Sequence, residues 1–275
     1  MGFFEFLNFN NITDFYMKNI RFFRYLFSLF VVGALSGCGG GGASAAATPA
    51  VPVPLAEVHI LVIGQSISSN CNEKIYGPVE NVFQIGKDGE LKAASDPFEW
   101  ADCKKGSMWM PLGKRLIDAG VARKVVFMPI GIAATSVQDW QAGGAAFSKL
   151  NSAIDVIQKK GIKFDFVFWH QGSSNVGTEK AIYKDRLSAV IDYVNGKIPV
   201  DRWLIAVHSR CYGAYDRNIE AAQIEIGDMT SLKRYRGANN NSLGDDFRFD
   251  GCHLTGNGQE SMASMWLDSV KTALK

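Results

Sequence analysis

The segment "LVIGQSISSNC", residues 61–71, decides the fold. An apolar run ends at Gly64, and three serines follow within six residues: Ser66, Ser68 and Ser69. Such a run is typical of a strand covered on both faces, as in a parallel sheet between helices. Ligands of open α/β sheets bind beyond the carboxyl ends of the strands. The serines therefore lie either in a functional loop, with one as a nucleophile, or in an ordinary polar loop.

Similar apolar runs recur along the chain and alternate with segments of helical periodicity. Strands are predicted at residues 58–63, 124–130, 164–170 and 202–208. Helices are predicted at residues 110–119, 145–160, 180–195 and 256–274. Strands that alternate with helices form right-handed βαβ units with a parallel sheet. The sequence thus predicts the α/β class, as a three-layer α/β/α sandwich with a short parallel sheet.

One long segment, residues 66–109, contains no strong helical pattern. Within it, "NVFQIGKDGELKAA" at 81–94 has a Lys-Asp-Gly-Glu turn between strand-like flanks, which predicts a small hairpin. A loop of this length inside a domain is usually functional.

Composition limits the class of protein and its partners. The 275 residues are 47% hydrophobic and 20% charged, which suits one folded domain. The formal charge of +2 arises from 29 basic and 27 acidic residues, so no basic field favours nucleic acid. We expect a small or neutral ligand and no nucleic-acid partner.

The N-terminal sequence "MKNIRFFRYLFSLFVVGALSGC", residues 17–38, has the three parts of a signal peptide: basic residues, an apolar run and small residues. The apolar run, residues 25–35, is shorter than the roughly 20 residues of a membrane-spanning helix. We therefore expect residues 1–37 to be a leader whose true start is Met17.

The end of this leader, "LSGC" at 35–38, resembles a bacterial lipobox. The resemblance implies cleavage before Cys38 and lipidation of that cysteine, with the alternative of an ordinary secretory leader. The glycines and the Ala- and Pro-rich sequence that follow, up to residue 56, predict a flexible tether. We expect a lipid-anchored protein of the bacterial cell envelope, with its domain at 57–275.

Four other cysteines remain for an oxidising compartment: Cys71, Cys103, Cys211 and Cys252. An even count predicts two disulfides, for which three pairings exist. We favour Cys71 with Cys103 and Cys211 with Cys252, because each pair joins loops that follow strand ends. Free buried thiols are the alternative.

The segment "DGCHLTGNGQE", residues 250–260, precedes the last predicted helix. The spacing of Asp250 and His253 lets the carboxylate accept a hydrogen bond from one imidazole nitrogen while the other faces a cleft. This is the orienting half of a Ser-His-Asp arrangement. Alternatively, Asp250 is a local helix cap and His253 is solvated.

Together, four blocks resemble the SGNH hydrolases, and within them the sialate O-acetylesterase-like carbohydrate esterases. The blocks are "GQSIS" (64–68), "AATSVQDW" (133–140), "WHQGSSN" (169–175) and Asp250 with His253. Two departures occur: Ala133 and Ala134 replace the family's glycines, and Ser173 stands where glutamate is usual. The resemblance implies a flavodoxin-like SGNH fold over nearly all of the domain.

The resemblance also implies roles for matching residues. Ser66 becomes the nucleophile, His253 its base and Asp250 the residue that orients His253. The backbone N–H groups of Ser66 and Ala134 and the side-chain amide of Asn175 become the oxyanion hole. The remaining matches imply substrate contacts by Gln65, Gln171 and Trp140. Because alanine tolerates a left-handed backbone poorly, we expect the Ala134 donor to require a negative φ.

Other histidines and metals are weaker candidates. His208 follows the fourth strand but has no carboxylate at matching spacing, and no spacing typical of zinc ligands occurs, so we expect neither metal nor cofactor. The resemblance predicts a serine esterase that hydrolyses O-acetyl esters of a carbohydrate. A lipase or thioesterase on the same scaffold, or a non-catalytic glycan-binding lipoprotein, is the alternative.

Overall fold

The predicted strands form one sheet in the computed structural model, which describes residues 54–213 and 215–275. The sheet has seven strands in the order β3-β2-β4-β1-β5-β6-β7. They are β1 (Val58–Gly64), β2 (Val82–Ile85), β3 (Leu91–Ala93), β4 (Val125–Pro129), β5 (Phe164–His170), β6 (Val200–Val207) and β7 (Arg234–Asn239). Adjacent strands are parallel, except that β2 and β3 form the predicted antiparallel hairpin.

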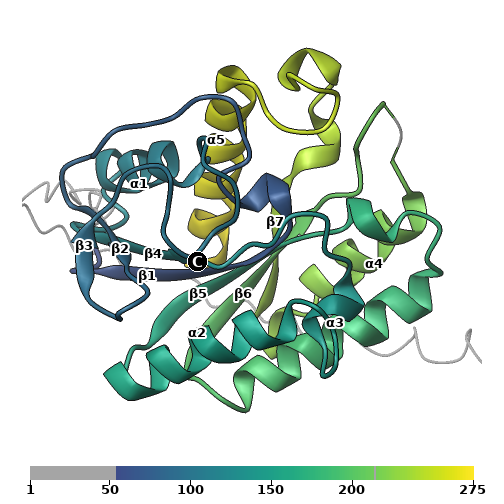
Figure 1. Cartoon of the computed structure of the whole chain (residues 1–275), viewed down its shortest axis with the longest axis horizontal. Helices are drawn as coiled ribbons and strands as arrows, with labels where there is room; N and C mark the ends of the chain where they lie inside the picture. Colours follow the sequence, from purple (N-terminus) through teal and green to yellow (C-terminus); the bar gives the residue numbers. More distant parts are fainter. Residues whose placement is uncertain (1–53, 214) are drawn as a thin grey trace, which may run out of the picture. The chain divides into compact units, whose positions relative to one another are not determined.

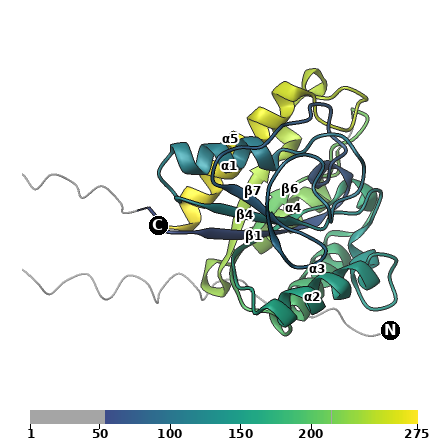
Figure 2. The same cartoon turned by 60° about the vertical axis from the view of Figure 1, so that its left-hand side comes forward.

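Helices cover both faces of this sheet, as Figures 1 and 2 show. One face carries α1 (Trp109–Asp118) and α5 (Gly256–Ala273). The other carries α2 (Phe147–Lys160), α3 (Lys180–Asn195) and α4 (Arg217–Gly227). The predicted three-layer α/β/α class is confirmed.

Alternate side chains of β1 enter the two hydrophobic cores. Leu61 and Ile63 belong to the core beneath α2, α3 and α4. Ile60 and Val62 belong to the core beneath α1 and α5. Because successive side chains of a strand point to opposite faces, a strand between two helical layers must be apolar at nearly every position.

The last residue of β1, Gly64, has to be glycine for a steric reason. A Cβ atom at this position would lie 2.2 Å from the carbonyl oxygen of His170 on β5. The chain then leaves the sheet in a short 3₁₀ turn, Ser66–Ser68. The serines of the opening segment therefore lie at the carboxyl end of the central strands.

Two elements are absent from the sequence prediction. The edge strand β7, "RYRGAN", has no apolar run and buries only Arg234 and Ala238. The helix α4 follows an N-cap, Asp216, whose side chain accepts two backbone N–H groups. Its apolar residues Ile219, Ala222 and Ile226 have helical spacing, so the periodicity offered a usable signal for α4.

The predicted leader, the lipidation site Cys38 and most of the tether lie in residues 1–53, outside the described residues. They remain predictions, which mass spectrometry of the N-terminus of the cell-derived protein would test. Within residues 54–213 and 215–275, the helices are too short or too polar to cross a membrane.

Candidate active site

A pocket of about 520 Å³ opens where the carboxyl ends of the central strands converge. Five loops contribute to its wall: Ser66 lies after β1, Ala134 after β4, Ser173 after β5, Tyr212 after β6, and His253 before α5. The volume is within the usual range for small-molecule sites. Segments that are far apart in the sequence thus meet at one site.

The three serines after β1 have different environments. The hydroxyl groups of Ser68 and Ser69 both donate to the carbonyl oxygen of Gln65, at 2.8 and 3.1 Å. Ser66 is 7% exposed and lines the pocket, and its hydroxyl makes no hydrogen bond with any described residue. Of the three, Ser66 alone presents an uncommitted hydroxyl to the pocket.

Asp250 and His253 form the expected pair in the turn before α5. His253 Nδ1 lies 2.7 Å from Asp250 Oδ2, while the backbone N–H groups of Cys252 and His253 donate to Oδ1. Burial acts to raise the pKa of Asp250, but the hydrogen bonds from His253 and these N–H groups outweigh it and hold the pKa below its usual value. The carboxylate is thus kept ionised and aimed at the imidazole.

The other imidazole nitrogen, His253 Nε2, is buried without a hydrogen-bond partner among the described residues. No hydrogen bond joins it to Ser66 within that part of the chain, although both side chains line the same pocket. In a site without substrate, catalytic hydrogen bonds are often long and tighten only in the complex.

Two backbone N–H groups at the pocket, those of Ser66 and Ala134, donate no hydrogen bond within the described residues. The φ angle of Ala134 is +59°, so the negative φ that this donor was expected to require is absent. The preceding residue explains how the turn is held: Ala133 N–H donates to Asp102 Oδ2 at 3.1 Å, and Lys149 Nζ binds Asp102 Oδ1 at 2.9 Å. Alanine therefore keeps a backbone conformation that suits glycine.

Replacing Ala134 by glycine should stabilise the protein. A left-handed conformation destabilises the fold by roughly 1–2 kcal/mol when the residue has a Cβ atom. Glycine removes this strain, but its greater entropy in the unfolded state lowers the stability by about 0.4–1 kcal/mol. We expect the free energy of unfolding in urea to rise by about 0.5–1 kcal/mol. The matched control is Ala133→Gly, where φ is not positive and the same change should lower stability. Equal destabilisation by both changes would contradict the assigned backbone strain.

Asn175, the third predicted oxyanion donor, is 2% exposed and is not part of the pocket wall. Its Oδ1 accepts from Val137 N–H and Gln171 Nε2, both at 2.8 Å. Its Nδ2 donates to Gln138 and Thr178 at 3.2 and 3.3 Å. In this structure the side chain links the second and third sequence blocks, and its role as an oxyanion donor stays a prediction.

The three predicted substrate contacts have different outcomes. Gln65 lines the pocket, with Nε2 2.5 Å from Ser173 Oγ and Oε1 2.9 Å from Gly172 N. Gln171 and Trp140 are fully buried and do not line the pocket, and their assignment as substrate contacts stays a prediction. Trp140 packs edge-on against Trp169 at 6.2 Å in the core. Ser173, which stands where the family has glutamate, thus positions Gln65.

The histidines at the ends of β5 and β6 are inside the protein. His170 and His208 are both fully buried, with ring centroids 5.1 Å apart. Burial, with a smaller effect of Arg248, lowers the pKa of His170 to about 3, and burial also lowers the pKa of His208. His208 Nδ1 contacts Asn240 rather than a carboxylate. Neither histidine lines the pocket, which leaves His253 as the base candidate among the described residues.

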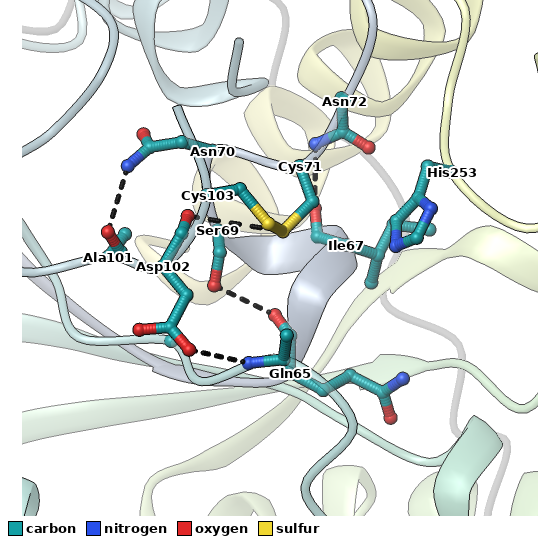
Figure 3. Close-up of a disulfide and its surroundings, with 12 residues drawn as sticks. Gln65, Ile67, Ser69, Asn70, Cys71, Asn72, Ala101, Asp102, Cys103 and His253 are labelled. Atoms are coloured by element: carbon teal, nitrogen blue, oxygen red, sulfur yellow. Dashed lines mark hydrogen bonds between the residues drawn. A yellow bond between two sulfur atoms is a disulfide. The ribbon is translucent and has the colours of Figure 1, made fainter. Parts of the chain in front are cut away.

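Both disulfides have the favoured pairing, Cys71–Cys103 and Cys211–Cys252. All four cysteines line the pocket. Figure 3 shows the first bridge above Gln65, with Asp102 next to Cys103. The second joins the residue before Tyr212 to the residue before His253. Sequence reasoning missed Tyr212, although an aromatic residue beside a cysteine after a strand end was a usable signal.

Comparisons with known proteins agree with this geometry. A family model described as carbohydrate esterase, sialic acid-specific acetylesterase, matches residues 62–272. No curated protein matches the sequence significantly. A solved structure of a protein from Arabidopsis thaliana has a TM-score of 0.59 and 16% identity, covering 80% of this chain and 98% of that one.

Two solved esterases are also similar. For a family 3 carbohydrate esterase from Clostridium thermocellum, the TM-score is 0.52 at 14% identity, with 79% of this chain and 97% of that chain covered. For a variant of an acetyl xylan esterase from Geobacillus stearothermophilus, the TM-score is 0.51 at 13% identity, with 80% and 97% covered. At these identities the likeness shows the fold, that of the SGNH hydrolases.

Proposed function

Because this chain belongs to the carbohydrate esterase, sialic acid-specific acetylesterase family and is thus an ester hydrolase, we propose that it removes O-acetyl groups from a carbohydrate by means of Ser66, His253 and Asp250. One juxtaposition carries the proposal: an uncommitted serine hydroxyl and an Asp-oriented imidazole line the same pocket.

In the first half of the reaction, Ser66 Oγ attacks the acetyl carbonyl carbon while His253 Nε2 takes the hydroxyl proton. Asp250 stabilises the imidazolium that forms. The tetrahedral intermediate collapses as the C–O bond to the sugar breaks, and His253 returns the proton to the departing sugar oxygen. Ser66 then carries the acetyl group.

In the second half, His253 takes a proton from water, whose oxygen attacks the acetyl carbon. Collapse of the second intermediate restores the Ser66 hydroxyl and releases acetic acid. The free N–H groups of Ser66 and Ala134 would stabilise the oxyanion in both halves, each for about 3–4 kcal/mol. Asn175 would add a third donor if its amide turned toward the substrate.

The preference for acetyl over longer acyl groups distinguishes this proposal from a lipase or thioesterase. We expect the purified protein to hydrolyse p-nitrophenyl acetate with a kcat/KM at least about tenfold above that for p-nitrophenyl octanoate, and to release acetate from peracetylated methyl xyloside. The full chain is used, and acetate is quantified enzymatically. Octanoate preference would favour the lipase alternative, and failure with every ester would favour a glycan-binding lipoprotein.

A further inference from the structure

The rim of the pocket carries one strongly exposed aromatic side chain. Tyr212 is 76% exposed, the highest value among the large exposed hydrophobic residues of the described chain, and it lines the pocket together with His253. Val176, 58% exposed, also lines this pocket. By contrast, Trp100, Trp109 and Trp140 are all buried, so none of them presents an exposed ring.

The backbone of Tyr212 is held in a costly conformation. Its φ angle is +54°, in the left-handed region that a residue with a bulky side chain seldom occupies. Its N–H donates to the carbonyl oxygen of Gly251 at 2.6 Å, and the Cys211–Cys252 bridge adjoins this contact. A Cβ atom at Gly251 would lie 3.2 Å from Tyr212 Cδ1. The turn that carries His253 therefore also fixes the tyrosine, and such strain commonly marks functional positions.

The charge of the residues that line the pocket limits which sugars can bind next to Tyr212. Besides His253, the described chain contributes no lysine, arginine, aspartate or glutamate to the pocket wall. Three nearby cations have other partners: Arg210 pairs with Asp245 at 3.0 Å, Lys105 lies 4.4 Å from the ring centroid of Phe249, and Arg248 binds backbone carbonyl groups such as that of Cys252. Specific recognition of a carboxylate usually requires an arginine or lysine at the site.

On the basis of the proposed function, we propose that Tyr212 stacks against the ring of an uncharged O-acetylated sugar. The substrate class is then neutral glycans rather than acidic sugars such as sialic acids. The apolar C–H face of a pyranose covers the tyrosine ring, while the acetyl group enters the pocket toward Ser66. Aromatic faces with a polar tip suit ligands that have both apolar and hydroxyl surfaces.

The test compares substrates with and without a sugar ring. In Tyr212→Ala, kcat/KM for acetylated methyl xyloside should fall about tenfold, mainly through KM, while hydrolysis of ethyl acetate changes less than about twofold. Tyr212→Phe should retain most of the activity, because the ring is kept. The matched control is Tyr215→Ala, since Tyr215 is 41% exposed in the same loop but does not line the pocket.

The charge of the sugar is tested with the unmodified protein, on acetylated methyl xyloside and on 9-O-acetylated sialic acid. A higher kcat/KM for the neutral ester supports the inference, and a higher value for the sialic acid overturns it. An equal loss of both activities in Tyr212→Ala, or no loss, overturns the stacking role. If the unmodified protein cleaves ethyl acetate but neither sugar ester, the inference fails while the esterase assignment stands; if it cleaves no ester, the proposed function fails as well.

Discussion

Ser66→Ala is expected to lower kcat/KM for p-nitrophenyl acetate by about 10⁴-fold or more, because no other group at its position can form the acetyl-enzyme. The hydroxyl makes no structural hydrogen bond with the described residues, so the folded state should be nearly unaffected. The melting temperature of the variant measures this directly. A large loss of activity at unchanged stability would identify Ser66 as the nucleophile.

The matched control for this experiment is Ser174→Ala. Ser174 lines the same pocket and is exposed, but belongs to the turn after β5. We expect its removal to change kcat/KM less than about threefold. If Ser66→Ala kept a tenth of the activity, or if Ser174→Ala were the inactive variant, the nucleophile would have to be assigned elsewhere.

His253→Gln should be almost as damaging, with a loss of about 10⁴-fold or more in kcat, because glutamine cannot take the proton of Ser66. Asp250→Asn should cost about 10³- to 10⁴-fold, since an amide no longer stabilises the imidazolium and can hold the wrong tautomer. Steady-state kinetics of both variants and of the double variant measure the energetic coupling between His253 and Asp250. Because the pair acts as a unit, the double variant should be little worse than His253→Gln alone.

His59→Gln provides the control for loss of a histidine. His59 lies on β1, which runs toward the pocket, and pairs with Glu57 before the strand. We expect full activity in this variant. Activity in His253→Gln within tenfold of the unmodified protein would contradict its role as the base.

The parts of the fold that follow from local hydrophobic pattern were predictable from the sequence. The strand at Phe164–His170 and the helix at Lys180–Asn195 have their predicted bounds, because each shows the periodicity that its buried surface requires. The polar edge strand β7 lacks such a pattern. Its Gly237 is needed because a Cβ atom there would lie 2.7 Å from Trp266, a contact that only the folded chain defines.

The meeting of the site loops was predictable because parallel strands bring their carboxyl ends to one edge. The orientation of individual side chains was not. Trp140 and Gln171 lie in the matching blocks, yet tertiary packing turns them into the interior. The left-handed backbone of Ala134 likewise depends on Asp102. The Asp102 carboxylate accepts the N–H of Ala133, a residue 31 positions away in the sequence.

The two cystine bridges connect loops to one another, and neither joins a strand or a helix. Apolar packing thus holds the sheet and its two cores together, whereas the loops that form the pocket wall are joined by disulfides. Reduction of both bridges would release segments of 32 and 41 residues around the catalytic groups while the apolar packing of the two cores remains. Closure of the pocket walls would then be an event separate from folding, favoured where thiols are oxidised.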